Sequence, residues 1–245
     1  MTVTQTKTES AAPDERVAKR SPFQKLLGRP EVGALVGAIV LFIFFALVSP
    51  TFTQPGALAT ILYGSSTIGI MAVGVSLLMI GGEFDLSTGV AVITSALTAS
   101  LFSWYFTTNV WVGVGLALVV SLSVGFINGW ILIKTKLPSF IVTLATFLML
   151  TGLNLGLTRL IGGSVSSPSI SNMEGFASAR AVFASSVTIG NVDIKITVFY
   201  WFALVAVATW VLMRTRVGNW IFAVGGDANA ARAVAGLSAY AKSSR

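Results

Sequence analysis

Six long runs of apolar residues, none of which contains Lys, Arg, Asp or Glu, constrain what this chain can fold into. Each run has about the 17–25 residues that a helix needs to cross a bilayer, and one charge at the centre of a span costs roughly 2.5–3.5 kcal/mol. Barrel strands are shorter and alternate in polarity, whereas helices satisfy their own backbone in lipid. The sequence therefore predicts an all-α, polytopic transmembrane helix bundle, with spans near 32–49, 57–80, 86–106, 110–133, 138–157 and 197–213.

The overall composition agrees with this fold class. Hydrophobic residues make up 54% of the 245 residues and charged residues only 10%, against about 25% charged in average soluble proteins. A soluble domain of this size has too little interior for so much apolar surface. The first run could instead be the apolar region of a signal peptide, but it is long for one and further spans follow it.

The polar segments predict how the chain is oriented in the membrane. If residues 1–31 form a flexible cytoplasmic tail, this tail, the cytoplasmic connections and the segment 214–245 together hold 13 of the 16 basic residues. The opposite side, which includes a long external loop over 160–196, holds Arg159, Arg180 and Lys195. Because Lys and Arg concentrate on the cytoplasmic side, we expect a multi-pass protein of the cell (inner) membrane with both termini in the cytoplasm.

Several functional classes are disfavoured by what the sequence lacks. The chain has no Cys and no His, so disulfides, thiolate metal sites and the commonest general base are absent. No G-x-x-x-x-G-K-[ST] phosphate loop occurs, so we expect no catalytic residue, no metal and no cofactor on this chain. The orientation bias accounts for the net charge of +7, so no nucleic-acid partner is needed.

Polar residues within the spans are candidates for a substrate path. Asn128 and Asn154 are amides inside the fourth and fifth runs, and Thr143 and Thr146 accompany them. Such groups face the bundle interior or a water-filled cavity, so the alternatives are a substrate path and a hydrogen bond between helices. Threonine is the weaker candidate because it can bond back to its own helix. Small-residue pairs predict close helix packing at Gly33/Gly37, Gly125/Gly129 and Gly152/Gly156.

The connection between the second and third spans reads Gly-Gly-Glu-Phe-Asp-Leu-Ser-Thr-Gly over residues 81–89. Asp85 is placed to cap a helix that starts at Leu86, and Gly81 and Gly82 permit a sharp turn. A capped turn and a functional loop are equally compatible with this pattern.

The segment after the last span contains Gly225-Gly226-Asp227, followed by a stretch rich in Ala. Asp227 can cap a short helix over 228–235, which Gly236 ends. A helix of this length is not stable alone, and its Ala and Val face is a poor lipid anchor. The pattern therefore favours a helix that docks on a protein partner.

Three segments together resemble the permease subunits of ribose-type ABC sugar importers, a branch related to the branched-chain permeases. They are residues 81–89, residues 125–129 with 137–146, and residues 214–232. Their order and spacing agree with the family over about residues 32–236. The motif residues carried by the first segment are Gly81, Gly82, Asp85, Ser87 and Gly89.

The resemblance implies a membrane subunit that forms part of a sugar translocation path. Its implied partners are a second permease subunit, a cytosolic ABC ATPase that binds the ATP, and an extracytoplasmic solute-binding protein. Residues 218–236 resemble the family's coupling loop, so the implied ATPase contacts are Gly225, Gly226, Asp227, Asn229, Ala231 and Arg232.

The chain departs from the family after Gly236, where members continue with further spans and this sequence is short and polar. The resemblance therefore implies a truncated permease. A non-transporting fragment and a passive solute facilitator are the alternatives, and the sequence does not identify the sugar. A proton- or ion-coupled carrier is disfavoured because such carriers hold ionisable groups in their spans.

Overall fold

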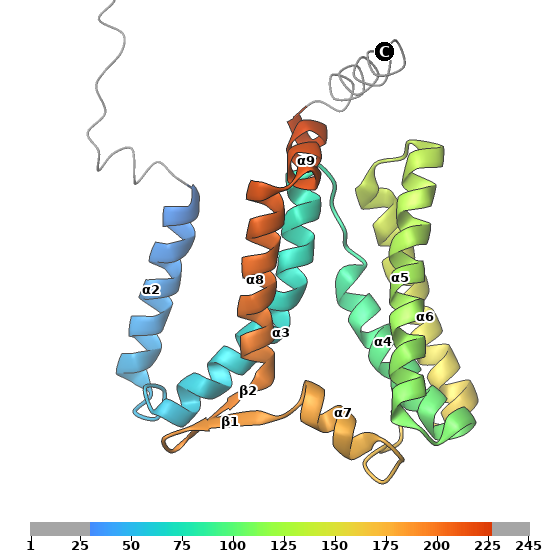
Figure 1. The fold of residues 1–245 in the computed structure, drawn as a ribbon, viewed down its shortest axis with the longest axis horizontal. Helices are drawn as coiled ribbons and strands as arrows, with labels where there is room; N and C mark the ends of the chain where they lie inside the picture. The colour runs from blue at the N-terminus through green and yellow to red at the C-terminus, as the bar shows by residue number, and fades with distance from the viewer. Residues whose placement is uncertain (1–29, 227–245) are drawn as a thin grey trace, which may run out of the picture. The chain divides into compact units, whose positions relative to one another are not determined.

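The computed structural model describes residues 30–226, most of which are helical (Figure 1). The chain divides at Gln54 into two units, which are described separately. The described part of the first unit is the apolar helix α2 (Pro30–Val48) and the turn after it. Phe52 in this turn packs on Phe42, with ring centroids 5.3 Å apart.

The second unit is built from five helices that are long and apolar enough to cross a membrane. They are α3 (Pro55–Ile80), α4 (Thr88–Phe102) with its π-helical continuation η1 (Ser103–Thr107), α5 (Val110–Thr135), α6 (Ser139–Gly162) and α8 (Ile196–Arg214). Their bounds confirm the prediction of a polytopic helical bundle. The apolar stretch Val32–Val48 of α2 is shorter, so a sixth span stays a prediction.

The helices of the second unit pack in two groups, α3 with α8 and α4 with α5 and α6. Glycine allows the closest approaches, because a Cβ at Gly69 would collide with the ring of Trp201, and one at Gly113 with the carbonyl of Ala99. A serine pair also joins α4 and α5, with the Oγ atoms of Ser95 and Ser121 2.6 Å apart.

The predicted small-residue contacts are not formed within either unit. Within its own unit, each of the six glycines has nothing beyond the local helix backbone within 4 Å of where a Cβ would stand. A small-xxx-small pattern permits close packing, but it does not decide which face of a helix meets a neighbour. These glycines are Gly33, Gly37, Gly125, Gly129, Gly152 and Gly156.

The predicted external loop over 160–196 contains more structure than the sequence reading gave it. The helix α6 continues to Gly162, so Arg159 lies in its last turn. A short helix, α7 (Phe176–Phe183), and an antiparallel hairpin of β1 (Ser186–Ile189) and β2 (Val192–Lys195) follow. Trp111 at the start of α5 donates its indole N–H to Ser178 at 2.8 Å, which anchors α7.

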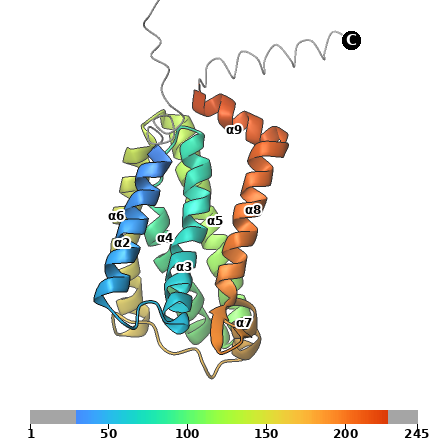
Figure 2. The ribbon, with the colours of Figure 1, turned by 90° about the vertical axis from the view of Figure 1, so that its left-hand side faces the viewer.

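The last described element is α9 (Arg216–Gly226), an amphipathic helix that the sequence reading left as part of a loop. It turns away from the axis of α8 (Figure 2). Thr215 sits extended between the two helices, and its Oγ1 accepts the N–H of Gly218 at 3.3 Å. Because α3, α5 and α8 run in one direction, α9 lies at the same end of the second unit as the loop after α3 (Figure 1).

Candidate functional site

The loop between α3 and α4 begins with a helix cap that requires glycine. Gly82 has a φ of +86°, the left-handed region that glycine adopts without strain. Its N–H donates to the carbonyl of Met79 at 3.0 Å, and that of Glu83 donates to the carbonyl of Leu78 at 3.1 Å. These two bonds form a Schellman motif that satisfies the last carbonyls of α3. The predicted sharp turn at Gly81 and Gly82 is therefore present.

Asp85 is the acceptor at the centre of this loop. Its Oδ1 accepts the backbone N–H of Ser87 at 2.7 Å and the Ser87 hydroxyl at 2.6 Å, while Oδ2 accepts the Thr88 hydroxyl at 3.1 Å. The predicted start of the helix at Leu86 is wrong, because α4 begins at Thr88. Asp85 thus binds the residue before the helix, and a carboxylate there still suits the positive end of the helix dipole.

Asn128 on α5 extends this arrangement into the bundle. Its Nδ2 donates to the Ser87 hydroxyl at 3.0 Å, and its Oδ1 accepts the hydroxyl of Thr146 on α6 at 2.6 Å. Asn128 is 7% exposed and Ser87 1%. From Thr146 through Asn128 and Ser87, each group donates toward the Asp85 carboxylate, and such a chain of bonds strengthens its members. We call Asp85, Ser87, Asn128 and Thr146 the latch.

Two further side chains of α6 hold the loop. The backbone N–H of Phe84 donates to the Ser139 hydroxyl at 3.0 Å, and that of Leu86 donates to Thr143 Oγ1 at 3.2 Å. Thr143 in turn donates to the carbonyl of Ser139 at 2.8 Å. A cavity of about 180 Å³ lies beside the loop, and Gly125 and Gly129 are among its lining residues. Gly89, the last glycine of the motif, is exposed.

The far end of α9 meets the start of the same loop. A Cβ at Gly225 would collide with the carbonyl oxygen of Ile80, and one at Gly82 would lie 3.5 Å from Gly225 Cα. Of the predicted ATPase contacts, Gly225 and Gly226 end α9. Asp227, Asn229, Ala231 and Arg232, together with the predicted helix over 228–235, lie outside the described residues.

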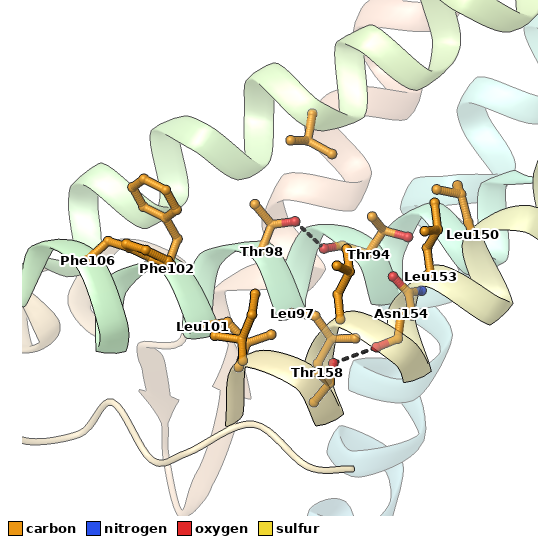
Figure 3. Close-up of a pocket in the computed structure, with 13 residues that line it drawn as sticks. Thr94, Leu97, Thr98, Leu101, Phe102, Phe106, Leu150, Leu153, Asn154 and Thr158 are labelled. Atoms are coloured by element: carbon orange, nitrogen blue, oxygen red, sulfur yellow. Dashed lines mark hydrogen bonds between the residues drawn. The ribbon is translucent and has the colours of Figure 1, made fainter. Parts of the chain in front are cut away.

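The other intramembrane amide, Asn154, lines a separate cavity of about 300 Å³ between α4, α5 and α6 (Figure 3). The Nδ2 atom of Asn154 is buried and has no hydrogen-bond partner among residues 30–226. The cavity is lined mainly by apolar side chains such as Leu97, Phe102 and Leu153, with Thr94, Thr98 and Thr158 as the other polar members.

The threonines of this cavity leave acceptor capacity free. Thr94, Thr98 and Thr158 each donate their hydroxyl to a carbonyl of their own helix, at 2.9, 2.7 and 2.6 Å. A hydroxyl oxygen can still accept a hydrogen bond while it donates one. The cavity therefore combines one amide side chain and three hydroxyls with apolar walls, a combination typical of sites for small molecules.

The four predicted path residues therefore fall into two places. Asn128, Thr143 and Thr146 lie in or beside the latch, where their polar groups bond to other residues, and Asn154 lines the cavity. Sequence reasoning missed Ser139 and α9, although the apolar spacing of Val217, Trp220, Ile221 and Val224 is typical of a helix face.

Within residues 30–226, no group of three or more Asp or Glu side chains could hold a metal ion.

The family profile and the individual relatives that match this chain all describe permeases. Residues 57–239 match the profile of the family described as branched-chain amino acid transport system / permease component. The chain is 28% identical over 209 residues to the ribose import permease protein RbsC of Haemophilus influenzae, covering 85% of this chain and 61% of that protein. No solved structure matches it.

Two further relatives have related names. The galactose/methyl galactoside import permease protein MglC of Escherichia coli is 32% identical over 216 residues, which cover 82% of this chain and 62% of MglC. The fructose import permease protein FrcC of Rhizobium meliloti is 26% identical over 201 residues, which cover 82% and 54%. The chain thus spans about three fifths of the length of the relatives it matches.

Proposed function

Because this chain belongs to the family of branched-chain amino acid transport system / permease components, we propose that it is a permease subunit of an ATP-driven importer. Its solute is a sugar or a similar small polar molecule. The observation that carries the proposal is the family match over residues 57–239, which contains all three motif segments. The names of the relatives, which are permeases for ribose, galactose and fructose, support the class of solute.

The proposed orientation places α9 and the loop after α3 on the cytoplasmic side. Lys134, Lys136, Arg214 and Arg216 lie at that end of the second unit, at or next to the ends of α5 and α8. Such basic flanks are typical of cytoplasmic helix ends. On this view α7 and the hairpin face outward, toward an extracytoplasmic solute-binding protein.

The proposed partners are a second permease subunit and a cytosolic ABC ATPase. The chain carries no phosphate-loop motif, so ATP hydrolysis belongs to the ATPase. The ATPase docks on the segment from Gly225 to Arg232, which follows directly from α9. The family resemblance of this segment supports the assignment, as does the place of its described start, Gly225 and Gly226, at the basic end of the second unit.

Asn154 is the proposed solute-path residue. Its side-chain amide would form a hydrogen bond with a solute hydroxyl, and Thr94 and Thr98 would accept from neighbouring hydroxyls. The apolar walls exclude water from these bonds and contact the C–H faces of a sugar ring. A volume of about 300 Å³ is at the lower end of the range for small-molecule sites, about 300–1,000 Å³.

A charge reversal tests the docking assignment. With a purified ABC ATPase subunit of a ribose importer as the probe, the full chain should capture the ATPase, and Arg232→Glu should weaken capture by roughly tenfold, or 1.4 kcal/mol. The matched control is Arg180→Glu on α7, which lies at the other end of the second unit and should leave capture unchanged. Equal capture by both variants would overturn the docking assignment.

A transport assay tests the importer assignment. Cells that express the chain with the ATPase and a solute-binding protein should take up labelled ribose, galactose or fructose only while ATP is present. Uptake that continues after ATP depletion would instead identify a passive facilitator.

A further inference from the structure

The closest approach between α9 and the end of α3 is made by backbone atoms. Gly225 stands against the carbonyl of Ile80, and no room exists there for even a methyl group. Ile221 Cγ2 lies 3.9 Å from where a Cβ of Gly81 would stand. Side chains hop between rotamers and absorb small displacements, whereas packed backbone transmits them. We call this contact, formed by Gly81, Gly82, Ile221 and Gly225, the junction.

The other end of α9 is equally constrained. A Cβ at Gly218 would collide with the carbonyl of Leu212 at the end of α8. The N–H of Asn219 donates to the carbonyl of Thr215 at 3.3 Å. The helix α9 is therefore held at its first turn by α8 and at its last turn by the end of α3.

The loop is just as firmly held at the end away from α9. The backbone of Phe84 and Leu86 donates to Ser139 and Thr143 on α6, and Ser87 accepts from Asn128 within the latch. Only Glu83 separates this bonded stretch from the glycine cap of α3. At this end of the second unit, a short segment therefore joins the two helix groups. Hydrogen bonds hold both ends of this segment.

From this geometry we infer that residues 81–87 are a rigid link that sets the position of α4, α5 and α6 according to the position of α9. Gly225, Ser87 and Asn128 are its positioning residues. The inference rests on the proposed function, in which the segment after α9 docks on an ATPase. A displacement of α9 then passes through the junction to the loop, and through the latch to the helices around the Asn154 cavity.

The link predicts that the latch and the junction are energetically coupled, which can be measured in the purified chain alone. The chain contains no Cys, so the pair Gly81→Cys and Ile221→Cys introduces two unique thiols across the junction. Ile221 Cγ2 lies 3.9 Å from where a Cβ of Gly81 would stand, so we expect the two sulfurs to come within bonding distance when the loop lies against α9. Its rate of formation under a fixed oxidant, followed by thiol counting, reports how often the loop lies against α9.

Opening the latch should slow this disulfide. In the Cys-pair background, Asn128→Leu should lower the rate by roughly five- to tenfold, the scale of a typical coupling between sites. Thr146→Val removes a single donor of the latch, so it disturbs folding less and should lower the rate by roughly threefold. The matched control is Asn154→Leu, the same change outside the latch, which should leave the rate as it is.

An unchanged rate in both latch variants would overturn the link, as would equal slowing by Asn154→Leu. This outcome is separate from the ATPase assignment. If the rates change as expected but Arg232→Glu does not weaken ATPase capture, the link stands and the docking segment is wrong. If capture is lost but the rates do not change, the docking segment stands and the link is wrong.

Discussion

The two amides inside the bundle, Asn128 and Asn154, have opposite surroundings. Asn128 donates to Ser87 and accepts from Thr146, so both ends of its amide are occupied. Asn154 has a buried Nδ2 without a partner in the described chain and lines a cavity of about 300 Å³. A satisfied buried amide stabilises a structure, whereas an unsatisfied one costs free energy. The comparison therefore separates an amide whose hydrogen bonds are used within the bundle from one whose Nδ2 has no partner in the described chain.

The difference arises from what each amide meets. Asn128 lies where the loop after α3 meets the bundle, next to the Ser87 hydroxyl, which is itself bonded to the Asp85 carboxylate. Asn154 lies where three apolar helix faces meet and only threonine hydroxyls are near. A polar residue within a span is thus not by itself a path residue, because a neighbouring polar segment can use its hydrogen bonds.

The largest expected effect is the loss of folding stability when a residue of the latch is replaced. Asp85→Ala removes the acceptor of three hydrogen bonds and leaves the buried Ser87 hydroxyl with an unmet donor. We expect the free energy of unfolding, measured by SDS titration in mixed micelles, to fall by roughly 2–4 kcal/mol. Glu83→Ala is the control, since no hydrogen bond joins the Glu83 carboxylate to a residue in the range 30–226, and it should change stability little. Equal losses in both variants would contradict the latch.

The next effect concerns the cavity side and is functional. Asn154→Leu removes the proposed hydrogen bond to the solute, so the KM for sugar uptake should rise by roughly tenfold. The maximal rate at saturating sugar should change less, because the latch and the junction are untouched. An unaltered KM would remove Asn154 from the proposed path.

The smallest effect tests how openly α6 is packed beside the cavity. At Gly152 nothing beyond the local helix backbone lies within 4 Å of a Cβ position, so Gly152→Ala should leave stability unchanged or raise it by up to about 1 kcal/mol through helix propensity. Gly113→Ala, where a Cβ would meet Ala99, should destabilise by roughly 1–3 kcal/mol. A loss at Gly152 as large as that at Gly113 would show a helix contact there.

The helices could be predicted from the sequence because run length and the absence of charge determine where a chain can cross lipid. The hydrogen bonds of Asp85 to Ser87 and Thr88 are local, but the prediction that Asp85 is the N-cap was wrong, because the N-cap of α4 is Ser87. The start of α4 was misplaced by two residues because the carboxylate bonds to the residue before the helix. The hairpin was missed although Gly190-Asn191 between alternating apolar residues is a known turn signal.

A hydrogen bond between helices was one of the two alternatives for Asn128, and its bond with Thr146 confirms it. Its partner Ser87 could not be predicted, because Ser87 is 41 positions away in the chain. The same holds for Ser139, which bonds to Phe84 across 55 positions. Neither pairing leaves a local pattern in the sequence. The glycines show that a visible sequence pattern can also mislead. The small-xxx-small pairs stand out in the sequence, but the close contacts are at other glycines: Gly69, Gly113, Gly218 and Gly225.

The most direct test of the distinction is the stability of two matched variants, Asn128→Leu and Asn154→Leu, measured by SDS titration in the same mixed micelles. We expect Asn128→Leu to lower the free energy of unfolding by roughly 1–2 kcal/mol, because it breaks two hydrogen bonds of the latch. Asn154→Leu should leave it unchanged or slightly raised, because it replaces an unsatisfied amide with an apolar side chain. Equal losses in the two variants, or a larger loss for Asn154→Leu, would contradict the separation of an amide that stabilises the bundle from an amide that has no partner in the described chain.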